Sequence, residues 1–443
     1  MRRDRPARTI DKEPSVYDVV GVGFGPANLA LAVAIEEHNA AAAPGDRVSA
    51  LFAERQPRFG WHRGMLIEGA TMQVSFLKDL ATMRNPASGF SFLCYLQDKG
   101  RLVDFINHKT FFPTRTEFHD YFSWAAGKVA HMASYGSEVA SVAPLGDGCE
   151  EIGGFALELA DGRTVSGRNL VVSGGLQPSM PAGVQQSERV WHNHGLLTNL
   201  AARTGPEPKR WTVVGAGQSA AEVTDHLHRA FPEAEVYSVF SRYGYSPADD
   251  SPFANRIFDP EAVDLFHGAP EHVKRQLFDY HRGTNYSVVD TDLIEELYRR
   301  VYQEKVTGAR RLHMLNACRV LDVREVPGGA RTTYEFTPTG ERAVLDSDIV
   351  VCATGYRPFD ALGLLGAAGG LCLRDEQGRP VVERDYRVAT DPRLTAGIYL
   401  QGGTEHTHGI TSSLLSNGAV RAGEILDSVL TARASRAGAV AAR

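Results

Sequence analysis

Short apolar runs that lead into glycines recur along the chain and predict the framework of the fold. Tyr17–Val20 runs into Gly21-Val22-Gly23, and Trp211–Val214 runs into Gly215-Ala216-Gly217. A stretch with helical spacing of apolar residues follows each turn. Two further runs end in glycine, "NLVVSGGLQPSMP" at 169–181 and "DIVVCATGYRP" at 348–358. This pattern predicts an α/β fold with two Rossmann-like dinucleotide-binding domains, the second inserted in the first.

The same pattern divides the chain into regions. Residues 14–205 and 346–430 are expected to form the first domain, and residues 206–245 and 311–345 the second. Residues 246–310 have helical periodicity without a glycine turn, which predicts a small, mainly helical substrate-binding region. Residues 1–13 are basic without an apolar core, and residues 431–443 are rich in alanine and arginine. Both ends are expected to be disordered.

Composition narrows the class of protein. The 443-residue chain is 43% hydrophobic and 23% charged, with a formal net charge of −6, so a nucleic-acid binder is not expected. No apolar stretch approaches the roughly 20 residues of a membrane span. The five cysteines form no CxxC pair or zinc pattern, and the histidine pairs in "WHNHG" and "EHTHG" lack a third ligand. We therefore expect a reduced, cytoplasmic protein without a bound metal or a membrane partner.

The first glycine turn has the features of an FAD site. Gly21 permits the tight turn, Gly23 lets a pyrophosphate approach the backbone, and Pro26 suits the first turn of the following helix. Glu54, at the end of the next apolar run, is expected to hold a ribose hydroxyl pair. It lies 31 residues after Gly23, and the insert "HNAAAAPGDR" accounts for the excess over the usual ~20. A solvated strand end is the alternative for Glu54.

The second turn is predicted to bind NADP. Gly215 and Gly217 form the turn, and the next apolar run, "EVYSVFSRYG", ends in Ser241 and Arg242 where an NAD site would have an acid. Arginine and serine accept a 2′-phosphate, although Arg242 can also be a simple surface charge. FAD plus NADPH indicates a flavoprotein that takes hydride from nicotinamide. Without a redox cysteine pair, the expected electron acceptor is oxygen or a partner protein.

Several longer blocks carry a family resemblance. They are "GVGFGPANLALA", "WHRGMLIEGATMQVSFLKDLATMRNPASGFSFLCYL", "FFPTRTEFHDYFSWA", "VVGAGQSAAEV", "DDSPFANRIFDP", "TNYSVVD" and "GGTEHTHGITSSLLSN". From about residue 14 to 430, the chain resembles the flavin-dependent N-hydroxylating monooxygenases, best their ornithine branch of siderophore and hydroxamate biosynthesis. The resemblance implies that NADPH reduces FAD, that O2 forms a C4a-hydroperoxyflavin, and that the substrate amine attacks it while NADP⁺ stays bound. It implies no catalytic acid or base from the protein and a homotetramer.

The resemblance also implies roles for individual residues. Lys78 would meet the carboxylate of the amino acid, Asn255 and Asn285 would bind the rest of it, and Leu415 would lie beside the reacting amine. On the flavin side it implies Trp61, His62 and Gln73, in addition to the first glycine turn. The NADPH contacts that it implies are Arg115, Gln218, Ser219, Tyr286 and, one position beyond the family's phosphate-binding arginine, Arg242.

The lysine in "MQVSFLKDL" (72–80) bears on the choice of substrate. Lys78 can reach solvent, pair with Asp79 or face a pocket and bind an anion. A carboxylate-binding lysine favours an amino acid over a diamine such as putrescine. L-ornithine is the expected substrate, and L-lysine remains open because one methylene is worth only about 1–3 kcal/mol in a pocket. A flavin reductase that passes electrons to a partner protein is the alternative from another class.

Overall fold

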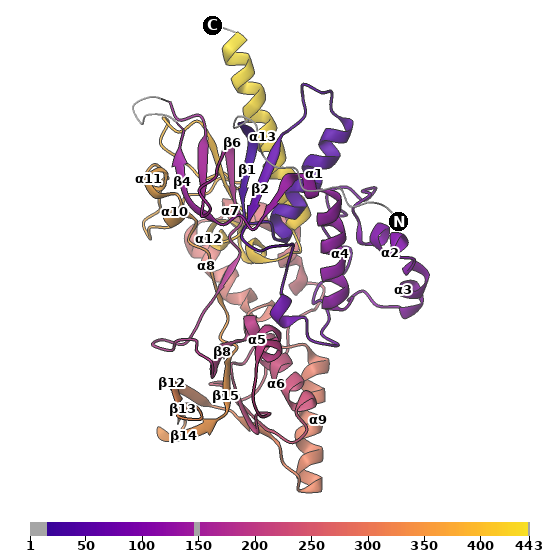
Figure 1. The fold of residues 1–443 in the computed structure, drawn as a ribbon, viewed down its shortest axis with the longest axis vertical. Helices are drawn as coiled ribbons and strands as arrows, with labels where there is room; N and C mark the ends of the chain where they lie inside the picture. Colours follow the sequence, from indigo (N-terminus) through magenta and orange to yellow (C-terminus); the bar gives the residue numbers. More distant parts are fainter. Residues whose placement is uncertain (1–15, 146–150, 442–443) are drawn as a thin grey trace.

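The computed structural model describes residues 16–145 and 151–441, and it has a sheet in each half of a long molecule (Figure 1). The upper sheet has seven strands in the order β3-β2-β1-β6-β5-β4, with β17 also paired to β6. Its strands are β1 (Tyr17–Val22), β2 (Ala50–Glu54), β3 (Ala133–Tyr135), β4 (Val139–Pro144), β5 (Phe155–Leu159), β6 (Thr164–Val172) and β17 (Gly397–Leu400). The expected disordered segment 1–13 lies outside the described residues.

The lower sheet has five parallel strands in the order β11-β10-β9-β15-β8. They are β8 (Val190–His192), β9 (Arg210–Val214), β10 (Glu235–Val239), β11 (Leu312–Leu315) and β15 (Ile349–Cys352). An antiparallel three-stranded sheet lies beside it, made of β12 (Cys318–Val326), β13 (Gly329–Phe336) and β14 (Glu341–Ser347). β7 (Leu176–Pro178) and β16 (Tyr356–Pro358) form an antiparallel pair where the chain leaves the first sheet for β8 and where it returns after β15.

This strand pairing corrects two of the expected domain boundaries. β8 and β15 were both assigned to the first domain by the divisions at residues 205 and 346, yet they pair in the second sheet. Both faces of this parallel sheet are covered by protein, so its strands are buried. The sequences of β8 and β15 are therefore short apolar runs like those of the first sheet. The second domain therefore extends from β8 to β15, and the paired strands β7 and β16 mark its limits.

Helices cover both sheets and fill the space between them. In the first domain, α1 packs against α4 and α13, and the aromatic side chains of α2 and α4 form the centre of its largest core cluster. The second domain is covered by α5 and α6. The helices outside residues 246–310 are α1 (Pro26–Ala41), α2 (Phe92–Asp98), α3 (Leu102–His108), α4 (Arg115–Lys128), α5 (Leu196–Ala202), α6 (Gln218–Ala230), α10 (Ala361–Leu364), α11 (Gly366–Gly369), α12 (Glu405–His408) and α13 (Gly418–Ala441).

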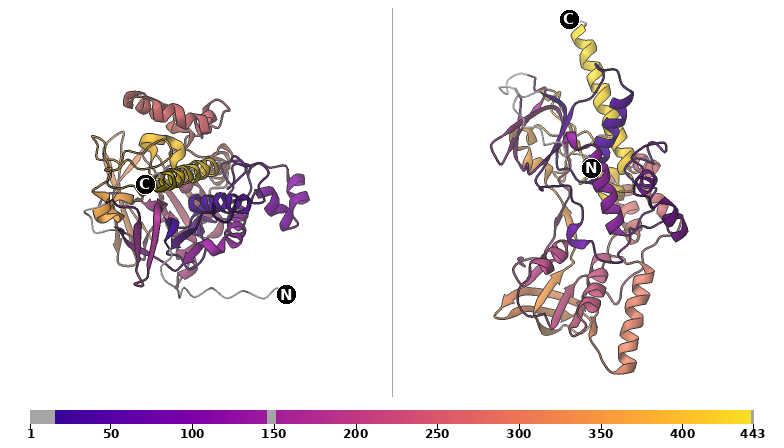
Figure 2. Two further views of the ribbon diagram at one scale, coloured as in Figure 1. Left: turned by 90° about the horizontal axis from the view of Figure 1, so that it is seen from above. Right: turned by 45° about the vertical axis from the view of Figure 1, so that its right-hand side comes forward.

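Residues 246–310 are mainly helical, as expected. The region contains α7 (Pro260–Gly268), α8 (Glu271–His281), α9 (Thr291–Thr307) and the short helical turns η4 (Ala254–Phe258) and η5 (Arg282–Thr284). None of the residues of α8 is buried, and the helix lies on the outside of the molecule (Figure 2). In contrast, α9 contributes Leu297 to the core cluster of the second domain, so it belongs to that domain's packing.

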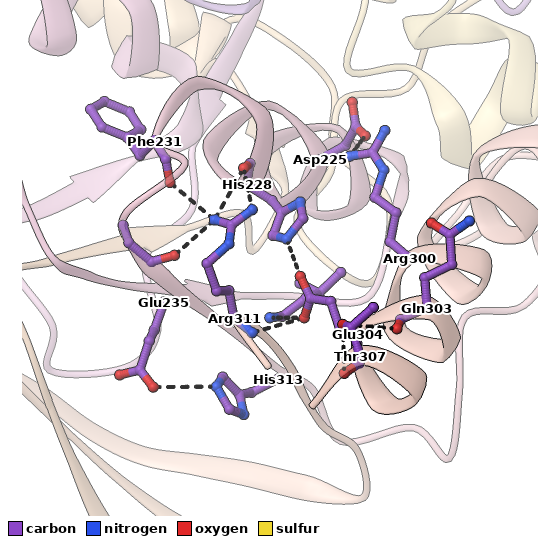
Figure 3. Close-up of polar contacts among 12 residues, drawn as sticks. Asp225, His228, Phe231, Glu235, Arg300, Gln303, Glu304, Thr307, Arg311 and His313 are labelled. Atoms are coloured by element: carbon purple, nitrogen blue, oxygen red, sulfur yellow. Dashed lines mark hydrogen bonds and ion pairs between the residues drawn. The ribbon is translucent and has the colours of Figure 1, made fainter. Parts of the chain in front are cut away.

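A polar cluster fastens α9 to the second domain (Figure 3). The carboxylate of Glu304 accepts hydrogen bonds from the ring of His228 (2.6 Å) and from the backbone N–H of Arg311 (2.8 Å). Arg311 in turn donates to the carbonyl oxygens of Phe231 and Ala234 just beyond α6. These bonds satisfy backbone groups that the end of a helix leaves without partners, and they connect α6, α9 and β11.

The carboxyl-terminal residues are helical where disorder was expected. α13 continues from Gly418 to Ala441, and residues 442–443 lie outside the described part of the chain. Alanine and arginine have high helix propensity. The arginines also anchor the helix: Arg433 donates to the carbonyl oxygens of Gly45 and Arg47, and Arg436 donates to that of Thr395. Within residues 16–145 and 151–441, no helix combines the length and apolar character that crossing a bilayer requires.

Candidate active site

The first glycine turn is shaped to receive a phosphate group. Gly23 has a φ of +81°, and a Cβ at this position would lie 2.5 Å from the carbonyl oxygen of Ser173. α1 begins directly after the turn with Gly25 at its N-cap, Pro26 in its first turn and no acidic residue there. Free backbone N–H groups at a helix start attract an anion. The turn, with Gly21 buried beneath it, therefore fits the pyrophosphate of FAD.

Glu54 stands at the end of β2 beside this turn. Its side chain is 7% exposed, and its two carboxylate oxygens accept from the backbone N–H groups of Phe24 (2.7 Å) and Gln56 (2.9 Å). A carboxylate has about four acceptor positions, so each oxygen keeps capacity for a ribose hydroxyl. Glu54 is thus a buried acceptor with positions left for a ligand, which argues against the solvated strand end.

Two residues that the motifs did not indicate support the turn from below. The buried Asn28 donates to the carbonyl oxygen of Gly23 (2.7 Å), and Gln401 donates to Asn28 (2.9 Å). Gln401 comes directly after β17, so the bond connects the start of the chain to its last strand. Asn28 lies three positions inside the helix from the turn, and this spacing is the only signal that the sequence offered.

The second glycine turn repeats this geometry in the second domain. Gly215 has a φ of +142°, and a Cβ there would collide with the carbonyl oxygen of Ala353. Gly217 is the N-cap of α6, which has no acidic residue in its first turn, and Ser219 is half-buried within that turn. The arrangement fits the pyrophosphate of a second dinucleotide.

Arg242 comes shortly after the end of β10. Because β9 and β10 are parallel, it lies at the same edge of the sheet as the second glycine turn. Its side chain is exposed and donates to the carbonyl oxygen of Ser287 (2.8 Å) and to Ser246 Oγ (3.2 Å). Ser287 itself passes close to Gly217, because a Cβ on Gly217 would lie 3.4 Å from the Ser287 Cα. The guanidinium is therefore held near the turn and keeps further donors for a 2′-phosphate.

Two further predicted NADPH contacts, Arg115 and Gln218, meet at a polar cluster between the domains. Arg115 forms a two-point ion pair with Glu222, with nitrogen–oxygen distances of 2.9 and 2.7 Å. Gln218 donates to Glu222 (3.0 Å) and to Asp290 (2.9 Å). Gln73, predicted on the flavin side, donates to Asp290 as well (3.0 Å). Neither acid was among the residues singled out from the sequence.

Trp61 and His62 lie beside α4 of the first domain, close to Phe122 and Arg115. The Trp61 ring meets Phe122 edge to face at 5.3 Å, and His62 has a left-handed backbone with a φ of 51°. The surrounding protein, and after it the Arg115 guanidinium, lowers the pKa of His62. An uncharged imidazole at this point does not compensate the negative charges of the cofactors, so other groups must compensate them.

The predicted substrate lysine does not pair with its neighbour. Asp79 accepts from the backbone N–H groups of Ala81, Thr82 and Phe92, which uses its carboxylate. Lys78 is half-buried, and its Nζ lies 5.8 Å from the centre of the Phe258 ring. Burial lowers the pKa of Lys78 against the opposing charge of Asp259. None of the ion pairs among the described residues includes Lys78, so its charge remains for a ligand.

Lys78 and Leu415 line one small cavity of about 20 Å³ between the starts of α1 and α13. Its other lining residues include Pro26 and Arg421. Asn255 belongs to η4, the same turn as Phe258, and η4 packs against the short turn η6 (Ile410–Ser413) that precedes Leu415. Three of the four predicted substrate residues are thus drawn from distant segments toward one place.

Asn285 and Tyr286 reach the same region from the other side. The Tyr286 hydroxyl donates to Glu405 Oε1 (2.6 Å), and Ser413 donates to the same oxygen (2.9 Å). Burial and the Glu405 carboxylate raise the pKa of Tyr286. Tyr286 therefore stays protonated and fixes the segment that carries Asn285. Asn255 is fixed by a hydrogen bond to the carbonyl oxygen of Asp250 (2.8 Å).

The histidines of "EHTHG" have structural partners. His406 shares a hydrogen bond with the carbonyl oxygen of Pro380 (2.8 Å), and His408 bonds the carbonyl oxygen of Arg384 and Thr407 Oγ1. His408 also stacks on Tyr386, with ring centres 4.1 Å apart. In the part of the chain that the structure describes, no group of three or more potential metal ligands comes together.

His408 makes the stability of the fold dependent on pH. Its side chain is 1% exposed, and burial lowers its pKa from 6.5 to about 3. Below pH 6.5 the unfolded chain binds this proton and the folded chain does not, so acid favours unfolding. Between pH 8 and pH 5 the loss is about 2 kcal/mol. Urea unfolding at both pH values should show that His408→Gln removes this part of the loss, whereas His131→Gln, at an exposed position, does not.

Two dinucleotide-binding domains, each with its glycine turn, and a half-buried cation at the start of the first helix are the features of a flavin- and nicotinamide-dependent monooxygenase. Residues 15–358 match the model of the L-lysine 6-monooxygenase/L-ornithine 5-monooxygenase family. The chain belongs to this family, which confirms the resemblance, the reaction class and the fold class predicted from the sequence.

Individual relatives cover nearly the whole chain. An L-ornithine N(5)-monooxygenase of Burkholderia cepacia is 41% identical over 408 residues, which are 89% of this chain and 90% of the relative. An ornithine N-hydroxylase of Kutzneria sp. 744, in a structure with reduced FAD, NADP⁺ and L-ornithine, is 50% identical with a TM-score of 0.90. That match covers 94% of this chain and 99% of that one. An L-lysine 6-monooxygenase of Pseudomonas syringae is 32% identical with a TM-score of 0.83, over 94% and 99% of the two chains.

Proposed function

We propose that the protein is an FAD- and NADPH-dependent L-ornithine N5-monooxygenase that consumes O2 and yields N5-hydroxyornithine for a siderophore or another hydroxamate. The observation that carries the proposal is Lys78, a half-buried cation that pairs with no acid among residues 16–145 and 151–441 and lines one cavity with Leu415. A carboxylate of the substrate supplies the missing charge. The relatives named for ornithine are 41% and 50% identical, against 32% for the lysine enzyme.

The residues of the site bind and orient the reactants. When bound at this site, FAD would supply the redox chemistry, which is acceptance of hydride from NADPH and transfer of the electrons to O2. The turn at Gly23 and the start of α1 hold its pyrophosphate, and Glu54 holds its ribose. The turn at Gly215 holds NADPH, with Gln218, Ser219, Arg242 and Tyr286 around it.

The substrate is held by Lys78, Asn255, Asn285 and the backbone near Leu415. Lys78 binds its carboxylate, which keeps the side-chain amine at the end of the substrate away from the lysine. Apolar side chains around the site, such as Phe258 and Leu415, exclude water from the reacting atoms. No acid or base of the protein is assigned to the chemical step.

The test presents L-ornithine, L-lysine and putrescine to the purified protein with FAD and NADPH. Oxygen uptake, hydrogen peroxide and hydroxylamine product are measured together, since uncoupled turnover consumes oxygen without hydroxylation. We expect product to match oxygen uptake with L-ornithine alone. If L-lysine gave as much product per oxygen consumed as L-ornithine, the assignment of ornithine as the substrate would be wrong. Oxygen uptake without any hydroxylated product would favour a flavin reductase.

Arg242→Ala is expected to reduce the preference for NADPH over NADH about tenfold, because an exposed charge-assisted hydrogen bond to the 2′-phosphate is lost. The measurement is kcat/KM with each nicotinamide. Arg319→Ala removes an exposed arginine that pairs with Glu335 in the three-stranded sheet, and it serves as the control. An unchanged preference in Arg242→Ala would remove this arginine from the NADPH site.

The proposed compartment is the cytoplasm, and the proposed assembly is a homotetramer. Four cysteines of the described residues, Cys94, Cys318, Cys352 and Cys372, carry free thiols, as is usual where thiols are kept reduced. Light scattering of the purified protein measures the assembly directly.

A further inference from the structure

The polar cluster between the domains joins three segments that are far apart in the sequence. Arg115 is the first residue of α4 in the FAD-binding domain, and Glu222 lies in the first turns of α6 in the NADPH-binding domain. Their side chains are 11% and 7% exposed. Asp290 is the N-cap of α9 and accepts from Gln73, which is 217 residues away. A buried two-point ion pair and a shared carboxylate thus connect both domains and the helical region.

The side-chain amide of Gln218 uses both of its donors and one acceptor position in this cluster. Its NH2 group donates once to Glu222 and once to Asp290, and its oxygen accepts from the backbone N–H of Asp290 (2.9 Å). A glutamine amide has two donors and two acceptor positions, so only one acceptor position remains for NADPH. Gln218 is therefore suited to hold the two acids in place, while its backbone at the start of α6 remains for the cofactor.

No other residue of the cluster takes over the hydrogen-bond acceptors that Glu222 and Asp290 supply. Arg115 bonds the carbonyl oxygen of Met65 in addition to Glu222 (3.0 Å), but Glu222 supplies its counter-charge. Asp290 is the common acceptor of Gln73 and Gln218, which approach it from different domains. Changing either carboxylate to an amide keeps the size of the side chain. It replaces one acceptor oxygen with an NH2 group that faces a hydrogen-bond donor, so one hydrogen bond is lost.

Hydride transfer depends on the relative placement of the domains, because reacting atoms must approach to about 3–3.5 Å and a shift of 1 Å can cost about a hundredfold in rate. We propose that Glu222 and Asp290 are positioning residues that fix the NADPH-binding domain against the FAD-binding domain for hydride transfer. The inference rests on the proposed function, in which the two domains carry NADPH and FAD.

The test uses Glu222→Gln, Asp290→Asn and the double variant of the full-length, FAD-loaded protein. The matched control is Glu235→Gln, which removes the charge of an exposed glutamate that pairs with Arg210 in the same domain. Three quantities are measured: the FAD content, the anaerobic rate of flavin reduction at saturating NADPH, and the dissociation constant of NADPH. Hydrogen exchange of residues 63–73 and 286–291 without NADPH reports on the cluster independently of activity.

We expect each single variant to reduce flavin about 10- to 100-fold more slowly, with full FAD content and less than a threefold change in NADPH affinity. Exchange in the two segments should be faster, and the double variant should be less impaired than the product of the two single effects. The control should match the wild type. Wild-type reduction rates in both single variants would overturn the inference, even if the variants are less stable.

Two results separate this inference from the proposed function. If the wild-type protein reduces its flavin with NADPH but hydroxylates no amine, the proposed function is wrong. The flavin-reduction test of Glu222 and Asp290 then still applies. Should both carboxylate variants fail to fold, Gln73→Leu carries the test, because Gln73 is exposed and contributes one hydrogen bond to Asp290. A slower reduction step with unchanged NADPH affinity supports the inference, and a wild-type rate overturns it.

Discussion

Replacing Lys78 with alanine should raise the apparent KM for L-ornithine about 30- to 700-fold. The loss of one charge-assisted hydrogen bond to a partly buried carboxylate costs about 2–4 kcal/mol, and this range corresponds to that change in affinity. Oxidation of NADPH should continue at a similar rate, because Lys78 is not part of either glycine turn. Steady-state assays of product and of NADPH oxidation over a wide range of ornithine concentration measure the two effects separately.

The diamine comparison sharpens the test of Lys78. Putrescine has no carboxylate for the lysine to bind, so the preference for ornithine over putrescine should shrink in Lys78→Ala. Lys99→Ala is the control, because Lys99 pairs with Asp120 on the surface and lies outside the site. An ornithine KM within twofold of the wild-type value would show that the carboxylate binds elsewhere.

The framework of the fold could be predicted because its signals are local. A strand, a glycine turn and a helix are adjacent in the sequence at Gly23 and again at Gly215, and both of these glycines have a positive φ. The domain boundaries could not be placed in this way. "DIVV" reads as a buried strand in either sheet, and only its pairing with β9 assigns β15 to the second domain. Strand pairing is a long-range property that a short apolar run does not encode.

The ends of the chain show a similar limit. The alanine and arginine residues after 430 were interpreted as a disordered tail, although the same composition favours a helix. What decides between the two is an anchor for the helix, and the carbonyl oxygens that bind Arg433 and Arg436 come from other parts of the chain. Composition alone carried no information on these partners.

The candidate site was predicted residue by residue but not as a network. Motif positions such as Glu54 and Lys78 follow from short stretches; Glu54 lies beside the first glycine turn, and Lys78 lines a small cavity. The partners of Arg115 and Gln73 are acids 107 and 217 residues away, so no local pattern reveals them. Glu222 alone had a usable signal, because it lies four residues after Gln218 on one helical face.

Gly23→Ala is expected to yield a protein with little bound FAD and a lower unfolding temperature. A side chain at a φ of +81° costs about 1–2 kcal/mol. The collision with the carbonyl oxygen of Ser173 adds about 1–3 kcal/mol of overpacking. The turn must move to relieve both, and it thereby displaces the backbone N–H groups at the start of α1 that would bind the pyrophosphate.

Gly45→Ala is the matched control, because a Cβ on Gly45 meets no atom within 4 Å and its φ is not positive. The FAD-to-protein ratio from absorbance, followed by fluorescence titration of FAD-free protein, compares the two variants. We expect FAD to bind at least about tenfold more weakly to Gly23→Ala, since that corresponds to only 1.4 kcal/mol of the strain. An FAD dissociation constant of Gly23→Ala within twofold of that of Gly45→Ala would show that the pyrophosphate is held by groups other than this turn and the start of α1.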